Sequence, residues 1–135
     1  MDQRTLRVLD VNLNRAREGL RVLEDTARLV WDDARLFEEL RSLRHALDKA
    51  TRAAYPKLVA ARDSESDPGR SLPEKKKRDR RGLVAANFRR AEEALRVLEE
   101  YGKVLSPSAA SRFKSFRYRL YSAEKASLPK TQPKK

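Results

Sequence analysis

Two sets of three charged side chains, one in each copy of an internal repeat, are the residues in this sequence whose types and spacing suit chemistry. The segment NLNRAREGLRVLE at 12–24 returns as NFRRAEEALRVLE at 87–99, and both copies keep Arg, Glu and Arg three residues apart. Arginine forms bidentate, charge-assisted hydrogen bonds with phosphate oxygens, so these groups suit a phosphorylated ligand or another partner. The set predicted from the repeat is Arg15, Glu18, Arg21, Arg90, Glu93 and Arg96.

The same spacing permits a second interpretation, in which these side chains form an exposed ladder of ion pairs. Residues three apart on a helix are neighbours, so Arg15 reaches Glu18 and Glu18 reaches Arg21. Each such pair contributes only about 0.2–0.5 kcal/mol, which is little reason to keep the same residues twice. Both interpretations stay open from the sequence.

A further set of repeated charges predicts salt bridges inside each half of the chain. The blocks LRSLRHAL and FKSFRYRL also match, and each places an arginine one residue beyond an apolar position. With the apolar residues at heptad positions a and d, Glu24 and Glu99 fall at position e. We therefore expect half-buried pairs of Glu24 with Arg44 and of Glu99 with Arg117, which fix helix register more than they add net stability.

The segment AARDSESDPG at 60–69 carries alternating carboxylates at Asp63, Glu65 and Asp67. A calcium loop is disfavoured because Pro68 stands where its sharp turn requires glycine. Two interpretations remain, an Asp-Pro-Gly turn and a carboxylate pair that helps to hold Mg²⁺ through a bound phosphate. No resident metal and no other cofactor is expected.

Signatures of catalysis are otherwise missing from the sequence. It contains no cysteine, which excludes a thiolate metal site and a cysteine nucleophile. The single histidine, His45, aligns with Tyr118 in the second copy, which argues against a catalytic base. There is no P-loop, nucleophile elbow or HExxH motif, so whether the chain is an enzyme stays open.

Apolar residues at alternating steps of three and four predict four helices. The first ends near 31–33, the second stops before Pro56, and Ser106 offers an N-cap to the fourth. The predicted fold class is all-α, a four-helix bundle of two antiparallel hairpins related by a pseudo-twofold axis.

We expect one domain followed by a short tail. The predicted domain covers 1–128, with hairpins at 4–55 and 81–127 and a connection at 56–80, and the predicted disordered basic tail is 129–135.

Charged residues make up 39% of the chain, and the net charge is +12. Much of the excess lies in KKKRDRR at 75–81 and in the lysines near the C-terminus, which raises nonspecific affinity for nucleic acid. The sequence contains no signal peptide and no run of 18 apolar residues, so we expect a cytoplasmic protein that does not enter a membrane.

In combination, LDVNLNRAREGLRVLEDTARLV, LRSLRHAL, AARDSESDPG and ANFRRAEEALRVLEEYGK followed by FRYRLY resemble the helical N-terminal extension of long, cyanobacterial-type thiamine-phosphate synthases. In those enzymes a (β/α)₈ barrel follows the extension and joins a pyrimidine diphosphate to a thiazole phosphate. The barrel is absent from this sequence, so the resemblance implies a stand-alone accessory domain of thiamine synthesis. Carried over by position, it adds Asn12, Arg62, Asp63, Asp67, Asn87 and Arg117 to the predicted binding set.

Three hypotheses for function follow. The first is a domain that binds a phosphorylated pyrimidine or thiazole intermediate, or docks onto a thiamine-phosphate synthase barrel. The second is a basic helical nucleic-acid-binding protein that uses residues 75–81. The third is a homodimerisation element in which faces around Val22 and Val97 form the contact.

Overall fold

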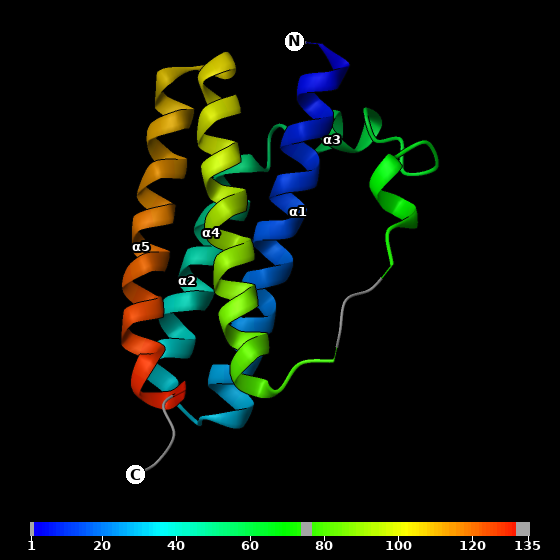
Figure 1. Cartoon of the computed structure of the whole chain (residues 1–135). Coiled ribbons are helices and arrows are strands. Elements are labelled where there is room, and N and C mark those ends of the chain that lie inside the picture. Colours follow the sequence, from blue (N-terminus) through cyan, green and yellow to red (C-terminus); the bar gives the residue numbers. More distant parts are fainter. Residues whose placement is uncertain (1, 74–76, 132–135) are drawn as a thin grey trace.

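The computed structural model describes residues 2–73 and 77–131, and within these ranges the chain is helical with no strand (Figure 1). This confirms the predicted all-α class. The long helices are α1 (Gln3–Asp25), α2 (Ala34–Thr51), α4 (Arg80–Leu105) and α5 (Pro107–Thr131). The short elements are the π-helix η1 (Thr26–Val30), the helix α3 (Tyr55–Ala60) and the 3₁₀ turn η2 (Pro68–Ser71).

Each long helix has an N-cap side chain that accepts a hydrogen bond from a backbone N–H group in its first turn. Asp2, Asp33 and Asp79 each accept from the N–H three residues ahead, at 2.7, 3.0 and 2.7 Å. Ser106 caps α5 in the same way, at 3.1 Å from the nitrogen of Ala109. Such a cap satisfies a donor that the helix leaves without a partner and contributes about 1 kcal/mol.

The apolar positions of the long helices form a common core. α1 and α5 each contact both α2 and α4, and α1 lies directly beside α4 (Figure 1). Leucines of the predicted seams are almost completely buried, among them Leu20, Leu40, Leu95 and Leu120. Burial of one such side chain contributes about 1.5–3 kcal/mol to the stability of the fold. The core therefore holds the helices in fixed positions relative to one another.

Gly19 marks the closest approach of α1 to α4. A Cβ atom at this position would lie 3.1 Å from the backbone oxygen of Asn87 and 3.3 Å from the Cβ of Ala91. The second copy of the repeat has Ala94 at the position of Gly19, so the repeat itself does not require glycine there. Glycine is required by the close contact between α1 and α4.

Replacing Gly19 with alanine should destabilise the protein by about 1–3 kcal/mol, because the added methyl group pushes the two helix backbones apart. In an uncrowded helix the same change would stabilise by up to about 1 kcal/mol. Urea unfolding of the variant measures the sign directly. An increase in unfolding free energy would show that α1 and α4 are not this close.

The first helix ends differently from the prediction. Regular α-helix stops at Asp25, and η1 continues the chain with wider turns. The hydroxyl of Thr26 donates to the carbonyl of Val22 at 2.8 Å, within the turn where the π-helix begins. Asp32 then adopts a positive φ of 48°, a conformation that aspartate tolerates better than most residues, and this reverses the chain into α2.

The predicted connection contains two short ordered elements. α3 begins one residue before the predicted start of the connection, and η2 begins within the Asp-Pro-Gly sequence, at Pro68. The carboxylate of Asp67 accepts a hydrogen bond from the N–H of Gly69 at 2.8 Å, which is the turn expected from the sequence. Of the basic run 75–81, residues 75 and 76 lie outside the described residues.

α5 continues through Pro129 to Thr131, three residues into the predicted tail. The hydroxyls of Ser127 and Thr131 donate to the carbonyls of Glu124 and Leu128 at 2.7 and 2.9 Å, which supports this last turn. The rest of the predicted tail, 132–135, lies outside the described residues. No helix in the described part of the chain is both long and apolar enough to span a membrane.

Candidate ligand-binding site

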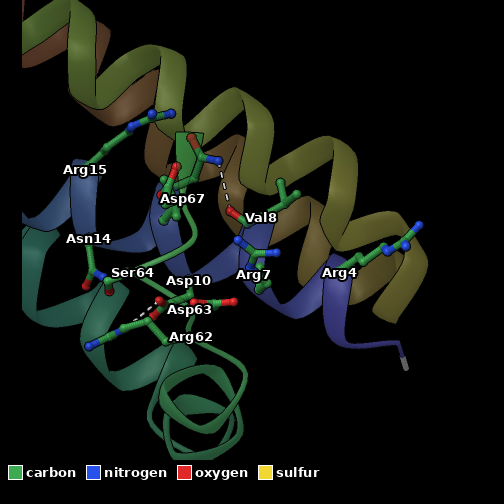
Figure 2. A pocket seen from close by; sticks show the side chains of 12 residues that line it. Arg4, Arg7, Val8, Asp10, Asn14, Arg15, Arg62, Asp63, Ser64 and Asp67 are labelled. Atoms are coloured by element: carbon green, nitrogen blue, oxygen red, sulfur yellow. Dashed lines mark hydrogen bonds and ion pairs between the residues drawn. The ribbon is translucent and has the colours of Figure 1, made fainter. Parts of the chain in front are cut away.

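A groove of about 510 Å³ separates the N-terminal half of α1 from the segment that follows α3 (Figure 2). Residues between Arg4 and Arg15 form one wall, and residues between Arg62 and Asp67 form the other. This volume lies within the range of small-molecule sites in proteins, about 300–1,000 Å³. The groove therefore has room for a ligand of metabolite size.

An ion pair between a buried carboxylate and an exposed guanidinium holds the two walls of the groove together. The guanidinium of Arg62 donates to both carboxylate oxygens of Asp10, at 2.8 and 2.7 Å (Figure 2). Asp10 is only 2% exposed, and a buried carboxylate requires such a partner. The hydrogen bond to Asp10 also raises the pKa of Arg62 above its ordinary value, so this guanidinium remains protonated.

Arg4, Arg7 and Arg15 lie on one face of α1, within an arc of about 80° at 3.6 residues per turn. All three line the groove, and Figure 2 shows them spread along the helix. None of the three forms an ion pair with any residue in ranges 2–73 and 77–131. Guanidinium groups without a carboxylate partner are suited to bind a phosphate.

The opposite wall presents carboxylates. Asp63 accepts a hydrogen bond from the N–H of Ser66 at 3.1 Å, and Asp67 accepts from Gly69 as described above. Both side chains line the groove. In the part of the chain that the structure describes, no three acidic or histidine side chains converge as ligands for a metal ion.

The groove brings together five of the twelve predicted binding residues. These are Asn12, Arg15, Arg62, Asp63 and Asp67. Asn12 is 95% buried, and its amide donates to the carbonyl of Val8 at 2.9 Å, as that of Asn87 does to Leu83. The remaining seven lie elsewhere: Glu18, Arg21, Asn87, Arg90, Glu93, Arg96 and Arg117.

Some repeated charged side chains outside the groove form ion pairs other than those expected from the sequence. Glu18 on α1 meets Arg90 on α4 at 3.6 Å. Arg96 meets Glu100 at 3.1 Å within α4. No ion pair among the described residues joins Glu18 to Arg15 or Arg21, so the ladder expected along α1 does not form, because Glu18 turns toward the neighbouring helix.

The two predicted intra-hairpin contacts are both present. The Arg44 guanidinium donates to both carboxylate oxygens of Glu24, and Arg117 donates to Glu99 through Nε and Nη2 at 3.1 and 2.8 Å. The bond to Glu24 raises the pKa of Arg44, and a bond to the Tyr121 hydroxyl, followed by that to Glu99, raises the pKa of Arg117. Since Arg117 is buried in this contact, it does not reach the groove.

Sequence reasoning missed Asp10, Arg4 and Arg7. Asp10 stands two heptads before Glu24, at the same position e, where a carboxylate beside the seam needs a cationic partner. This signal was available, but the second copy has Ala85 in its place, so the repeat did not draw attention to it. Arg4 and Arg7 precede the repeated segment altogether.

A pair of carboxyl groups lies between α4 and α5, away from the groove. Burial, and next the neighbouring carboxyl group of Glu124, raise the pKa of Glu92 to about 8. The Oε2 atom of Glu92 is buried and accepts no hydrogen bond from the described residues. The folded protein therefore holds a proton on this pair that the unfolded chain releases near pH 4.5.

This predicts stability that falls as pH rises. The raised pKa of Glu92 stabilises the fold fully below pH 4.5, and the contribution is lost as pH rises through about 8. The partial exposure of Glu92 weakens the effect, so we expect a loss of about 1–2 kcal/mol from this pair. Urea unfolding at pH 5 and pH 9 measures this effect. The free energy of unfolding of Glu92→Gln should exceed that of the parent protein only at pH 9. The control Glu93→Gln, at the exposed neighbour, should match the parent at both pH values.

The chain is similar to thiamine-phosphate synthases from several organisms. The thiamine-phosphate synthase of Thermosynechococcus vestitus is 45% identical over 127 residues, which cover 92% of this chain and 35% of the relative. That of Synechocystis is 46% identical over 127 residues, covering 90% and 36%. That of Rhodopirellula baltica is 41% identical over 120 residues, covering 86% and 32%. The chain thus spans about a third of the length of these relatives.

No solved structure matched the chain. Residues 7–126 match the family described as the ThiD2 family. The matched range includes both copies of the repeat and the groove wall at 62–67. With the curated relatives, this confirms the resemblance found in the sequence, and the chain belongs to the ThiD2 family.

Proposed function

We propose that this domain binds a phosphorylated pyrimidine or thiazole intermediate of thiamine synthesis in the groove between α1 and residues 62–67. The relatives support the pathway, since each is a thiamine-phosphate synthase that contains a matching segment. The observation that carries the choice of ligand is the row of three arginines on one face of α1, unpaired within the described residues and facing a groove of metabolite size.

The two walls divide the work of binding. Arg7 and Arg15 on α1 donate to the phosphate oxygens, where charge-assisted bonds contribute about 1.5–3 kcal/mol each. Arg62 is already paired with Asp10, so it positions the second wall instead of neutralising the ligand. Asp63 and Asp67 accept hydrogen bonds from the ring, or share a Mg²⁺ whose remaining ligands are phosphate oxygens and water.

We also infer that α1–α2 and α4–α5 form a four-helix bundle of two equivalent hairpins about an approximate twofold axis. Matching bonds support this: Glu24 with Arg44 corresponds to Glu99 with Arg117. The groove departs from this symmetry, because Asp10, which binds Arg62 of the connecting segment, has Ala85 as its counterpart in the second hairpin. Within the described residues, the second hairpin therefore has no equivalent of the Asp10–Arg62 contact.

A thermal-shift series with the pyrimidine phosphate and the thiazole phosphate, with and without Mg²⁺, tests the proposed ligand. A ligand at 100 times its Kd stabilises the folded state by about 2.7 kcal/mol, so the true ligand should raise Tm by several degrees. Sodium chloride at matched ionic strength is the control. If neither phosphate raises Tm beyond that control, the proposed function is wrong.

Docking onto a synthase is a second candidate function. The observation in its favour is that the relatives contain the matching segment within a chain about three times as long. Sedimentation of the domain with a purified synthase barrel tests it, and a complex that resists 0.5 M salt would support docking. Independent sedimentation of the two proteins would exclude it.

A further inference from the structure

A second hollow, of about 580 Å³, opens at the end of the molecule where α2 gives way to α3 and α4 turns into α5. Figure 1 shows α3 and the α4–α5 turn at the same end as the start of α1. Buried side chains form its floor, among them Leu9, Leu13, Leu98 and Phe113. It shares no lining residue with the groove described above.

Small residues keep this hollow open. Ala50, Ala53, Ala54 and Ala109 stand around it, where larger apolar side chains would fill the space. Leu105 on its edge remains 41% exposed, whereas the leucines of the core are closed to water. Protein interiors are normally close-packed, and apolar surface left in contact with water is unfavourable by roughly 25 cal/mol per Å². The arrangement therefore favours an apolar occupant.

One cation stands beside this apolar surface. Lys57 is the only charged residue among those that line the hollow, and its ammonium group forms no ion pair with the residues the structure describes. The other polar side chain, Thr51, already donates its hydroxyl hydrogen to the carbonyl of Leu47 at 2.9 Å. An occupant that is apolar over most of its length and negative at one end matches this lining.

We propose that the hollow binds a medium-chain monocarboxylate, with its hydrocarbon chain against the leucine floor and its carboxylate at Lys57. The volume of about 580 Å³ falls within the range of small-molecule sites, about 300–1,000 Å³, so the hollow suits a single small molecule. This site goes beyond the proposed function, because it lies apart from the arginines of α1 and takes a ligand without phosphate.

Calorimetric titration of the full chain with hexanoate, octanoate and decanoate below their micellar concentrations tests this site. Each added pair of methylene groups should strengthen binding by more than tenfold, since each methylene contributes about 0.8 kcal/mol. Octylamine, with the opposite charge, should bind at least tenfold more weakly than octanoate. Lys57→Ala should abolish this preference, while Lys49→Ala, an exposed lysine on α2 outside the hollow, should keep it.

Two filling variants locate the binding. Ala53→Leu at the exposed rim and Ala109→Leu at the start of α5 should each weaken octanoate binding at least fivefold while the circular dichroism spectrum stays helical. Affinity that ignores chain length, or that both variants leave unchanged, would overturn the proposal. Sedimentation that shows dimers in the absence of octanoate, lost in the same variants, would overturn it too, because a second copy would then be the occupant.

Discussion

Replacing Glu24 by alanine is expected to lower the free energy of unfolding by about 3 kcal/mol. Glu24 is 1% exposed, and its removal leaves the partly buried Arg44 guanidinium without the carboxylate that takes two of its hydrogen bonds. Breaking one side of a buried ion pair commonly destabilises by about 3–5 kcal/mol. We expect the lower end, because Asp48 lies 3.8 Å from the same guanidinium and replaces part of the interaction.

Two further variants make this result specific. Glu18→Ala removes an exposed carboxylate from its pair with Arg90 and should change stability by less than about 0.5 kcal/mol. The double variant Glu24→Met with Arg44→Met should recover most of the loss, since an apolar pair of similar volume often replaces a buried ion pair well. Urea unfolding measures all three. Equal effects for Glu24→Ala and Glu18→Ala would contradict the burial described for this pair.

Replacing Arg7 and Arg15 together by alanine is expected to weaken binding of the phosphorylated ligand by at least about 100-fold. Each guanidinium supplies a charge-assisted hydrogen bond of about 1.5–3 kcal/mol, and 1.4 kcal/mol corresponds to a factor of ten. Because neither side chain forms an ion pair with the described residues, the double variant should keep nearly the parent unfolding free energy. Its effect should therefore appear in affinity and not in stability.

Arg112→Ala provides the matched control for that experiment. Arg112 is an exposed arginine on α5 and does not line the groove. Its removal lowers the net charge without touching the site, so affinity should change by less than about twofold. Similar losses in Arg112→Ala and in the double variant would mean that the ligand responds to the net charge of +12 and not to the groove.

The repeat made much of the helical structure predictable, because period and composition encode local geometry. The seam of leucines places Leu20 and Leu95 at equivalent buried positions, and heptad position e places Glu24 and Glu99 beside it. Their pairing with Arg44 and Arg117 depended only on the short turn within each hairpin. Residues at similar distances from a short turn lie at the same level on the two helices that it joins, so such contacts can be predicted from the sequence.

The groove was harder to predict, because its second wall comes from a distant segment. Arg62 and Asp10 are 52 residues apart in the sequence, and no period connects them. The close approach at Gly19 is equally invisible to a pattern, since it depends on which two helices face each other. The same limit explains the outcome for the predicted binding residues. They were spread over both copies of the repeat, and of those in the repeats the structure places only Asn12 and Arg15 in the groove.

The most direct test of the groove as the phosphate site is a ¹H–¹⁵N NMR titration of the full chain with the pyrimidine phosphate and with the thiazole phosphate. One of them should shift amide and guanidinium signals along 4–15 of α1 and in 62–67, and leave α5 unchanged. These shifts should disappear in Arg7→Ala with Arg15→Ala and persist in Arg112→Ala. Saturable shifts centred on Arg96 and Arg117, or no saturable shifts with either phosphate, would contradict the account.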